Sequence, residues 1–354
     1  MTLAPSPSPT PGAAVAQRLG SVRRPRSVRV LWLLVVLAVL VAVMTTSVAV
    51  GSRGVGWSEI VAALGGSSET IGEAAVTKRI PRTVLAVVVG AALGLSGAVM
   101  QGVTRNPLAD PGVLGINMGA SLAVVVGFAW FGLFSATSIV WTAIAGAALA
   151  AVFVYAVGSL GRGGATPLKL ALAGTATSAA LISFLTAVAL PRGDIAESIQ
   201  SWEIGGVGGA SFSGLRTVLP FLVVGFAVSL LSARALNSLA LGDELAAGLG
   251  ERVVLARGVA ALGSVLLCGA ATAVAGPIGF VGLVVPHVCR LLVGVDHRWL
   301  LPFTALTGAC LLTASDVVGR IVARPSEIDV GIITALIGAP FFIAIVRRQK
   351  VREL

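Results

Sequence analysis

The sequence predicts an all-α polytopic membrane protein with ten transmembrane helices, and three observations lead to this fold class. Of its 354 residues, 56% are hydrophobic and only 11% are charged, whereas an ordinary soluble domain carries about 25% charged residues. Uncharged apolar runs long enough to cross a bilayer recur along the chain. The Lys and Arg residues stand mainly at the ends of those runs, where such residues report on membrane topology.

Each predicted span rests on an apolar run of roughly 20 residues, the length of helix that crosses the hydrocarbon core. The run from 111 to 161 carries no charge and suits two spans, which turn near 131–137. The run from 258 to 289 is too long for one span, so we place a break at Gly276-Pro277. In order, the expected spans are 30–52, 83–104, two within 111–161, 170–190, 217–233, about 256–275, about 278–293, one that begins at 299, and 330–346.

The two ends of the chain are short and polar, and no polar stretch is long enough to form a separate soluble domain. Residues 1–29 are rich in Pro, Ser, Ala and Arg, so we expect a disordered cytoplasmic tail. Arg23-Arg24 could belong to a twin-arginine signal, but the uncharged run that follows exceeds the roughly 7–15 residues of a signal h-region. The predicted organisation is an N-terminal tail (1–29), a transmembrane domain (30–346) and a C-terminal tail (347–354).

Ten spans place both termini on the same side of the membrane. With that side taken as the cytoplasm, seventeen Lys and Arg residues fall on inner segments and eight on outer segments. This excess agrees with the positive-inside rule and puts residues 239–250 in the cytoplasm. Eight outer cations are more than the rule leads us to expect, and they require a further explanation.

A short, partly apolar segment at residues 239–250 separates two of the long apolar runs. It can form about two helical turns between flanking glycines. Asp243 and Glu244 stand in the first turn, where the helix dipole favours negative charge. A short capped helix of this kind can dock a partner, although a solvated loop with one helical turn would have the same spacing. The flanking glycines are Gly242, Gly248 and Gly250.

The sequence argues against an enzyme, a metalloprotein and a nucleic-acid-binding protein. No Gly-Lys dipeptide occurs, so the chain has no P-loop, and neither a nucleophile elbow nor a zinc motif is present. His287 and His297 are the only histidines, and no pair of carboxylates or cysteines completes a metal-ligand set. No basic patch with interleaved aromatic residues occurs. The cysteines are expected to be small buried hydrophobic residues: Cys268, Cys289 and Cys310.

Several residues inside the spans indicate close helix packing, because small residues let helix backbones approach each other. The glycines expected between helices are Gly90, Gly94, Gly97, Gly279 and Gly282. Asp316 and Arg320 are four residues apart on one helix face and can pair, which would make their burial tolerable. A proton relay is the other role open to Asp316.

The connection at residues 106–112, Asn-Pro-Leu-Ala-Asp-Pro-Gly, cannot be a continuous helix because it holds two prolines. Irregular backbone close to a membrane is tolerated where it lines a cavity or is buried in protein. The segment is therefore either a gate or a tight turn.

Six stretches, in this order along the chain, resemble the FecCD-type permease subunits of ABC importers for ferric siderophores, haem and cobalamin. They cover nearly all of residues 79–346, and the tail of residues 1–29 lies outside the resemblance. The stretches are Arg79-Ile-Pro-Arg-Thr83; Gly97-Ala-Val-Met-Gln-Gly102 with residues 106–112; Leu172-Ala-Gly174; residues 239–250; Gly276-Pro-Ile-Gly-Phe-Val-Gly-Leu-Val-Val-Pro-His287 with Arg290; and Val330-Gly331 with Ile337-Gly-Ala-Pro-Phe-Phe342.

The resemblance implies the type II ABC importer permease architecture, in which two ten-span permeases form a homodimer or heterodimer around a central path. The implied partners are the second permease subunit, two cytoplasmic ATPase subunits that bind ATP and Mg, and an extracytoplasmic solute-binding protein. The chain itself is then expected to carry no cofactor and no catalytic residue.

The resemblance also implies roles for individual residues. Residues 239–250 look like the coupling helices that sit in a cleft of the ATPase. The coupling residues are expected to be Leu241, Gly242, Asp243, Glu244, Ala247, Gly248, Leu249 and Gly250. The residues that align with the cytoplasmic gate are Asn106, Leu108, Thr166 and Pro167. Arg79 and Arg82 match outer arginines that meet acidic residues of the binding protein, and Arg320 or Arg324 resembles a third, which would explain the outer cations.

Two positions depart from the family pattern. Asp329 follows Glu327-Ile328 where the family often has Pro, and Glu203 stands in a segment where the family is usually apolar. Both departures concern local structure on the outer side.

Together, the residues and the resemblance predict a multi-pass permease of the bacterial cytoplasmic membrane with both termini inside. It is expected to move an iron chelate inward by alternating access, driven by the separate ATPases. The chelate is expected to be a ferric siderophore, with haem and cobalamin as the other candidates. The alternative is a secondary, ion-coupled transporter of a small solute, which the scarcity of intramembrane acids argues against. A membrane-anchored structural or signalling protein would carry no solute at all.

Overall fold

The computed structural model of the chain describes residues 25–112, 115–161, 167–192 and 202–350, and every regular element within these ranges is a helix. Seven helices are long and apolar enough to cross a membrane, and three shorter apolar helices bring the number to ten. The predicted all-α fold with ten membrane helices is therefore confirmed, and the chain is a multi-pass membrane protein.

The helices follow the predicted spans in order. The seven long helices are α2 (Arg26–Ala49), α4 (Ile71–Thr104), α6 (Ala136–Ser159), α7 (Pro167–Ala189), α9 (Phe212–Leu231), α12 (Val253–Ala275) and α14 (His297–Val322). The shorter apolar helices are α5 (Ile116–Phe131), α13 (Val281–Val293) and the part Val330–Ala344 of α15 (Val330–Lys350). Three further helices lie between spans: α3 (Trp57–Leu64), α10 (Ala233–Leu239) and α11 (Asp243–Gly248).

The predicted tails differ from the helix bounds. Helix α2 begins at Arg26, inside the expected tail of residues 1–29, and residues 1–24 lie outside the described ranges. Helix α15 continues to Lys350, so the expected C-terminal tail of residues 347–354 begins as helix.

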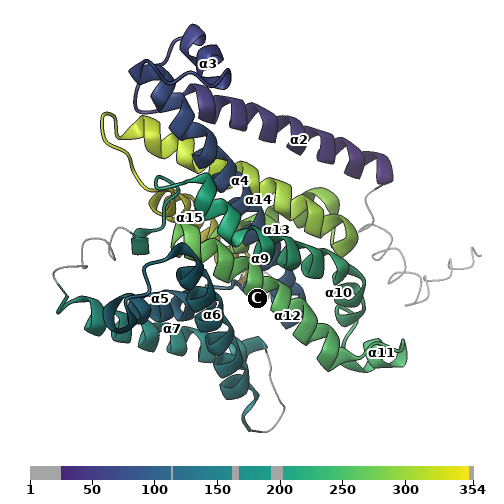
Figure 1. Cartoon of the computed structure of the whole chain (residues 1–354). Coiled ribbons are helices and arrows are strands. Elements are labelled where there is room, and N and C mark those ends of the chain that lie inside the picture. The colour runs from purple at the N-terminus through teal and green to yellow at the C-terminus, as the bar shows by residue number, and fades with distance from the viewer. Residues whose placement is uncertain (1–24, 113–114, 162–166, 193–201, 351–354) are drawn as a thin grey trace, which may run out of the picture.

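Helix α4 is the centre of the bundle, and α14 covers it most extensively, followed by α12 and α13 (Figure 1). Of the 18 most apolar consecutive residues of α4, 78% are buried, whereas only 11% of the corresponding residues of the peripheral helix α2 are buried. The helix is longer than the predicted span because a capping box fixes its start. Thr70 Oγ1 accepts a hydrogen bond from the Glu73 N–H at 3.2 Å, and the Glu73 carboxylate accepts one from the Thr70 N–H at 3.3 Å.

Glycines allow the central helices to meet backbone to backbone. A Cβ atom on Gly90 would strike the Gly308 backbone on α14, and one on Gly97 would strike the Gly282 backbone on α13. A Cβ on Gly94 would lie 2.5 Å from the Thr304 carbonyl oxygen. The packing prediction is wrong for Gly279, because nothing lies within 4 Å of a Cβ there and the residue is exposed in the loop before α13.

The break between α12 and α13 lies where Gly276-Pro277 predicts it. Helix α12 ends at Ala275, and Gly276 takes a φ of 68°, a left-handed conformation that favours glycine. A side chain there would also collide with the Trp202 carbonyl. The Gly206 N–H donates to the Ala275 carbonyl at 2.8 Å, so residues 202–206 close the end of α12.

The same segment holds one of the two departures from the family pattern. Glu203 is half-buried, and burial raises the pKa of its carboxyl group. Asp329, the other departure, directly precedes α15 and its carbonyl accepts from the Ile332 N–H at 3.1 Å. Burial also raises the pKa of the Asp329 carboxyl group. An acidic residue at a helix N-terminus is favoured by the helix dipole, so Asp329 can begin the helix where the family often uses Pro.

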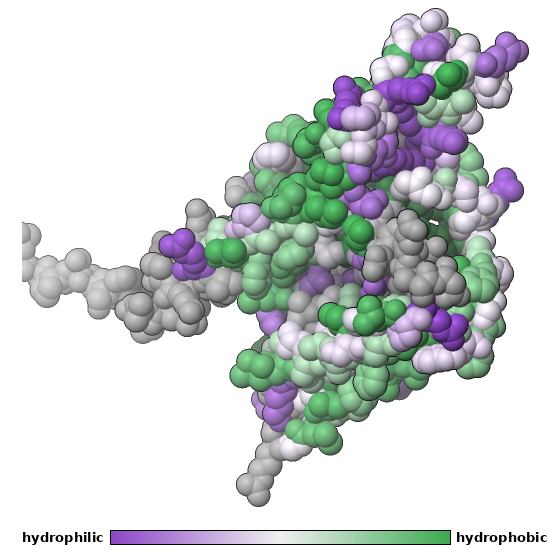
Figure 2. All heavy atoms as spheres, turned by 90° about the vertical axis from the view of Figure 1, so that its left-hand side faces the viewer, coloured by the Kyte–Doolittle hydropathy of each residue, from purple (hydrophilic) through white to green (hydrophobic). Residues whose placement is uncertain are grey.

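The bundle has two ends, which we name the α3 end and the α11 end after the short helices that mark them (Figure 1). The α3 end also holds the start of α4 and the last turn of α14. On the face drawn in Figure 2, apolar residues cover the middle of the molecule, and hydrophilic residues gather at the upper end, over α3 and the start of α4. This distribution fits a bundle whose sides face lipid and whose ends face water.

Candidate functional site

Helix α11 and its flanking glycines form a separate small unit at the α11 end. Gly242 adopts a φ of 106°, which only glycine accepts readily, and the turn it makes lets α11 begin at Asp243. Asp243 and Glu244 are in the first turn, as predicted. Ala246 is fully buried against the bundle, whereas Ala247, Gly248 and Gly250 are exposed.

Asp243 connects α11 to two membrane helices. One of its carboxylate oxygens lies 2.9 Å from the Arg105 guanidinium, at the end of α4, and 2.8 Å from the Arg257 guanidinium on α12. All three side chains are partly exposed, so each pair contributes only modestly to stability. Their geometric effect is larger, because one carboxylate ties α11 to both α4 and α12.

Three leucines in α11 and directly beside it are exposed to solvent. Leu241, Leu245 and Leu249 are 56%, 63% and 68% exposed. Exposed leucines beside a charged helix start indicate an interaction surface more than a solvated loop. Leu245 was not among the predicted coupling residues, although its place in the middle of the short helix could have singled it out.

The predicted gate is only partly described. Helix α4 ends at Arg105, whose φ of 52° is left-handed, and the chain then turns. The Asn106 side-chain oxygen accepts a hydrogen bond from the Leu108 N–H at 2.9 Å, and this bond stabilises a turn around Pro107. Leu108 is half-buried. Thr166 lies outside the described residues, and Pro167 begins α7 with a side chain that is not described.

Two residues of the stretches that resemble the family lie beside the predicted gate, and the sequence alone predicts no role for them. Arg290, in the last turn of α13, donates a hydrogen bond to the side-chain oxygen of Gln101 on α4. The Gln101 amide in turn donates to the Gly282 carbonyl at 3.1 Å. This chain of contacts locks α13 to α4 near the α11 end.

The four predicted docking arginines lie at the α3 end, but two of them are buried. Arg79 is 6% exposed and donates to the carbonyls of Ala49 at 3.0 Å and Arg53 at 2.7 Å. Arg320 is 1% exposed and donates to the Ser47 carbonyl at 2.9 Å. This burial contradicts their expected place on an exposed surface.

The reason is that the start of α4 is a packed helix, so its arginines turn toward partners inside the chain. Arg82 is half-buried and pairs with Asp316 at 2.8 Å and with Glu327 at 2.5 Å. Arg320 pairs with Asp316 at 2.9 Å, as their spacing predicts. Arg324 is exposed, although its guanidinium donates to the Gly51 carbonyl at 2.6 Å. Arg82 and Arg320 thus share Asp316, whereas Arg79 and Arg324 bond to backbone carbonyls at the end of α2 and just after it, and only Arg324 of the four is exposed.

The part of the chain that the structure describes holds no group of three or more His, Cys, Asp or Glu side chains suited to a metal ion. The three cysteines are free and buried, which agrees with their predicted packing role: Cys268, Cys289 and Cys310.

Ten apolar helices with a glycine-packed centre define a polytopic membrane protein, and α11 protrudes at one end of it (Figure 1). The chain belongs to the FecCD transport family, whose model matches residues 16–348. It is thus a permease of the ABC importer type.

Individual relatives agree with this family. The chain is 46% identical over 77% of its length to the iron(3+)-hydroxamate import system permease protein FhuB of Bacillus subtilis (strain 168), of which it covers 71%. It is 42% identical over 93% of its length to the ferric enterobactin transport system permease protein FepD of Escherichia coli (strain K12), of which it covers 98%. A solved structure of a metal-chelate type ABC transporter in an inward-facing conformation matches with a TM-score of 0.76 at 28% identity, over 89% of this chain and 98% of that chain.

Proposed function

We propose that this chain is one of two permease subunits of an importer that carries an iron chelate inward, with a ferric siderophore as the first candidate. The two relatives named above act, by their names, on ferric hydroxamates and ferric enterobactin. Haem and cobalamin are the other chelates that the family resemblance allows. The second subunit is either a copy of this chain or a related permease.

The observation that carries the proposal is the geometry of α11. Leu245 and the leucines on either side of the helix are exposed. The Asp243 carboxylate is ion-paired to Arg105 at the end of α4 and to Arg257 on α12. A partner that grips α11 would therefore pull directly on two membrane helices. We infer that the partner is a cytoplasmic ATPase subunit, that the α11 end faces the cytoplasm and that both termini lie there too. The ATP and Mg sites would belong to that partner.

At the α3 end, the docking surface for an extracytoplasmic binding protein needs exposed cations. Arg324 keeps this role, and Arg53 and Lys78 are exposed at the same end. Arg79, Arg82 and Arg320 would act indirectly, by holding the ends of α2, α4 and α14 together beneath that surface.

The test is ATP-driven uptake of a ferric siderophore into proteoliposomes that hold the chain, its second permease subunit, its ATPase and its binding protein. Asp243→Lys with Glu244→Lys should lower both co-purification of the ATPase and uptake by at least tenfold. Glu69→Lys changes the charge of an exposed acid at the α3 end and is the matched control for ATPase binding.

The experiment has clear opposing outcomes. Normal ATPase recovery and uptake with the double variant would refute the coupling role of α11. Uptake that follows a proton gradient and continues without the ATPase would refute the ABC mechanism in favour of ion-coupled transport.

A further inference from the structure

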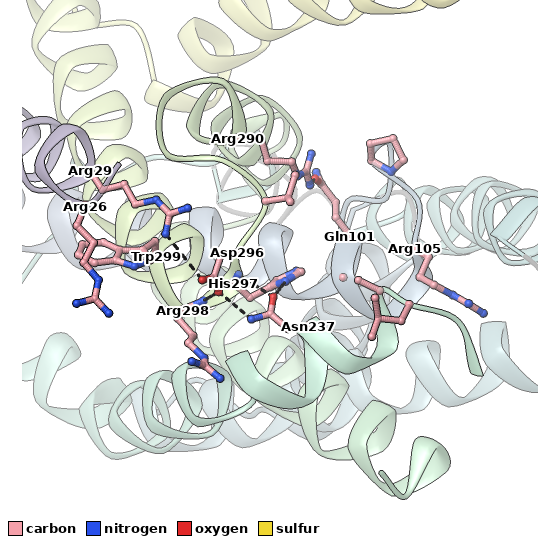
Figure 3. A pocket seen from close by; sticks show the side chains of 15 residues that line it. Arg26, Arg29, Gln101, Arg105, Asn237, Arg290, Asp296, His297, Arg298 and Trp299 are labelled. Atoms are coloured by element: carbon pink, nitrogen blue, oxygen red, sulfur yellow. Dashed lines mark hydrogen bonds and ion pairs between the residues drawn. The ribbon is translucent and has the colours of Figure 1, made fainter. Parts of the chain in front are cut away.

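A cavity of about 980 Å³ opens at the α11 end of the bundle, beside the first turns of α2 and α14 and the last turns of α4 and α13 (Figure 3). Its lining is strongly basic, and among the described residues that line it Asp296 is the one carboxylate. The five arginines that line it are Arg26, Arg29, Arg105, Arg290 and Arg298. None of the predicted coupling or gate roles accounts for this concentration of charge.

Asp296 can offset only one of these five positive charges, and Asp243, which pairs with Arg105 at 2.9 Å, can offset one more. Asp296 accepts from the Asn237 amide at 2.8 Å and from the Arg298 N–H at 3.1 Å. Burial works to raise the pKa of Asp296, but these hydrogen bonds and the charge of Arg29 hold it below its usual value. Arg290 faces the neutral side chain of Gln101 (Figure 3). The cavity therefore keeps a net positive charge.

Arg29 is the most deeply buried of the five arginines that line the cavity. It is only 8% exposed, and its Nε atom has no hydrogen-bond partner among the described residues. Its guanidinium comes no nearer than 3.8 Å to Asp296 and lies 5.8 Å above the ring of Trp299. A buried guanidinium with an unused donor is costly unless an acceptor completes its hydrogen bonds.

The start of α2 adds to the attraction for an anion. Its N-cap, Pro25, makes no side-chain cap, and the first turn holds no acidic residue. The first N–H groups of this 24-residue helix carry a positive partial charge next to Arg26 and Arg29. Beyond the cavity, Leu31 and Leu34 on α2 are about 60% exposed and can lie against acyl chains.

We propose that this cavity binds a phosphoryl group, supplied either by an anionic lipid headgroup or by free phosphate. Guanidinium groups match phosphate oxygens with paired donors, and a phosphoryl group offers enough acceptors for several arginines at once. Basic pockets between membrane helices near the lipid headgroups suit this ligand.

The test uses the full chain in phosphatidylcholine nanodiscs, with phosphatidylglycerol and inorganic phosphate as the two probes. Binding is measured by native mass spectrometry for the lipid and by isothermal titration for phosphate. Arg29→Gln should weaken binding at least tenfold, and Arg29→Lys should restore part of it. Because Arg29 is buried, the double variant Arg26→Gln with Arg298→Gln changes only exposed side chains and should also weaken binding at least tenfold.

Arg234→Gln is the matched control, since Arg234 is an exposed arginine at the same end that does not line the cavity. Its binding should equal that of the wild type. Selective loss of phosphatidylglycerol binding in the cavity variants supports the proposal with a lipid as the source, and selective loss of phosphate binding supports it with free phosphate as the source. If the wild type retains neither probe better than the Arg26/Arg298 double variant, the proposal is overturned.

Discussion

Replacing Gly94 with Ala should force apart the two helices at the centre of the bundle. A Cβ at this position would lie 2.5 Å from the Thr304 carbonyl oxygen and 3.2 Å from the Gly308 Cα atom, both on α14. Ordinary van der Waals contact begins near 3.4 Å. Both neighbouring atoms belong to backbone, so no side chain can rotate away, and α4 and α14 must separate.

Two opposing contributions set the size of the effect. Ala stabilises a helix interior by up to about 1 kcal/mol relative to Gly. Overpacking a close contact costs about 1–3 kcal/mol, and the upper part of that range applies because the obstruction is backbone. The net destabilisation should be about 1–2 kcal/mol. With about 2.1 cal/mol/K of unfolding entropy per residue, that corresponds to a fall in Tm of about 1–3 °C for a chain of this size.

The assay is thermal unfolding of the purified chain in detergent, followed by size-exclusion chromatography with fluorescence detection. Gly279→Ala is the matched control, because nothing lies within 4 Å of its Cβ and the residue is in a loop. It should leave the Tm within about 1 °C of the wild type. If Gly94→Ala melts at or above the wild-type temperature, the backbone contact between α4 and α14 does not limit packing.

Three further predictions concern the ion pairs and the topology. Asp316→Asn removes a fully buried carboxylate that pairs with Arg82 and Arg320, and it should destabilise the chain by about 3–5 kcal/mol. The measurement is the Tm, and Glu244→Gln, at an exposed site, is the control that should have little effect. Although burial raises the pKa of Glu327, hydrogen bonds from Arg82 and Ser52 and the charge of Arg82 hold it below its usual 4.5. The stabilisation from Glu327 is therefore complete above pH 4.5 and is lost as the pH falls below it, so the Tm gap between wild type and Glu327→Gln should close on acidification; a gap independent of pH would contradict this pairing. Because the native cysteines are buried, a membrane-impermeant maleimide applied to intact cells should label Ser68→Cys at the α3 end and spare Gly248→Cys; the reverse pattern would invert the proposed orientation.

The sequence predicts the membrane helices well, because each apolar run must cover itself with lipid or protein. The turn between α5 and α6 and the break before α13 lie where uncharged length and Gly276-Pro277 place them. Helix α11 is also predictable, since Gly242 supplies its start and Asp243 its first-turn charge. The start of α4 is not predictable from hydropathy, because a capping box in a polar stretch decides it.

The burial of the arginines at the α3 end could not be predicted from the local sequence. Arg82 is separated by 234 residues from Asp316 and by 245 from Glu327, so nothing near Arg82 reveals its partners. Arg79 uses backbone carbonyls at the end of α2, which have no sequence signature. A charge count finds the excess of cations predicted for the outer side but cannot tell a docking surface from an internal network.

The same contacts explain how a small helix could move a large bundle. Asp243 reaches α4 through Arg105, and α4 meets α14 and α13 at glycines where backbones touch. Gln101 and Arg290 fix α4 to α13 again near the α11 end. Helices joined by backbone contacts cannot slide past one another without losing close packing, so they should move together. A displacement of α11 would therefore be delivered to α4, α13 and α14 as one body, while α2, which is mostly exposed, would follow at the periphery.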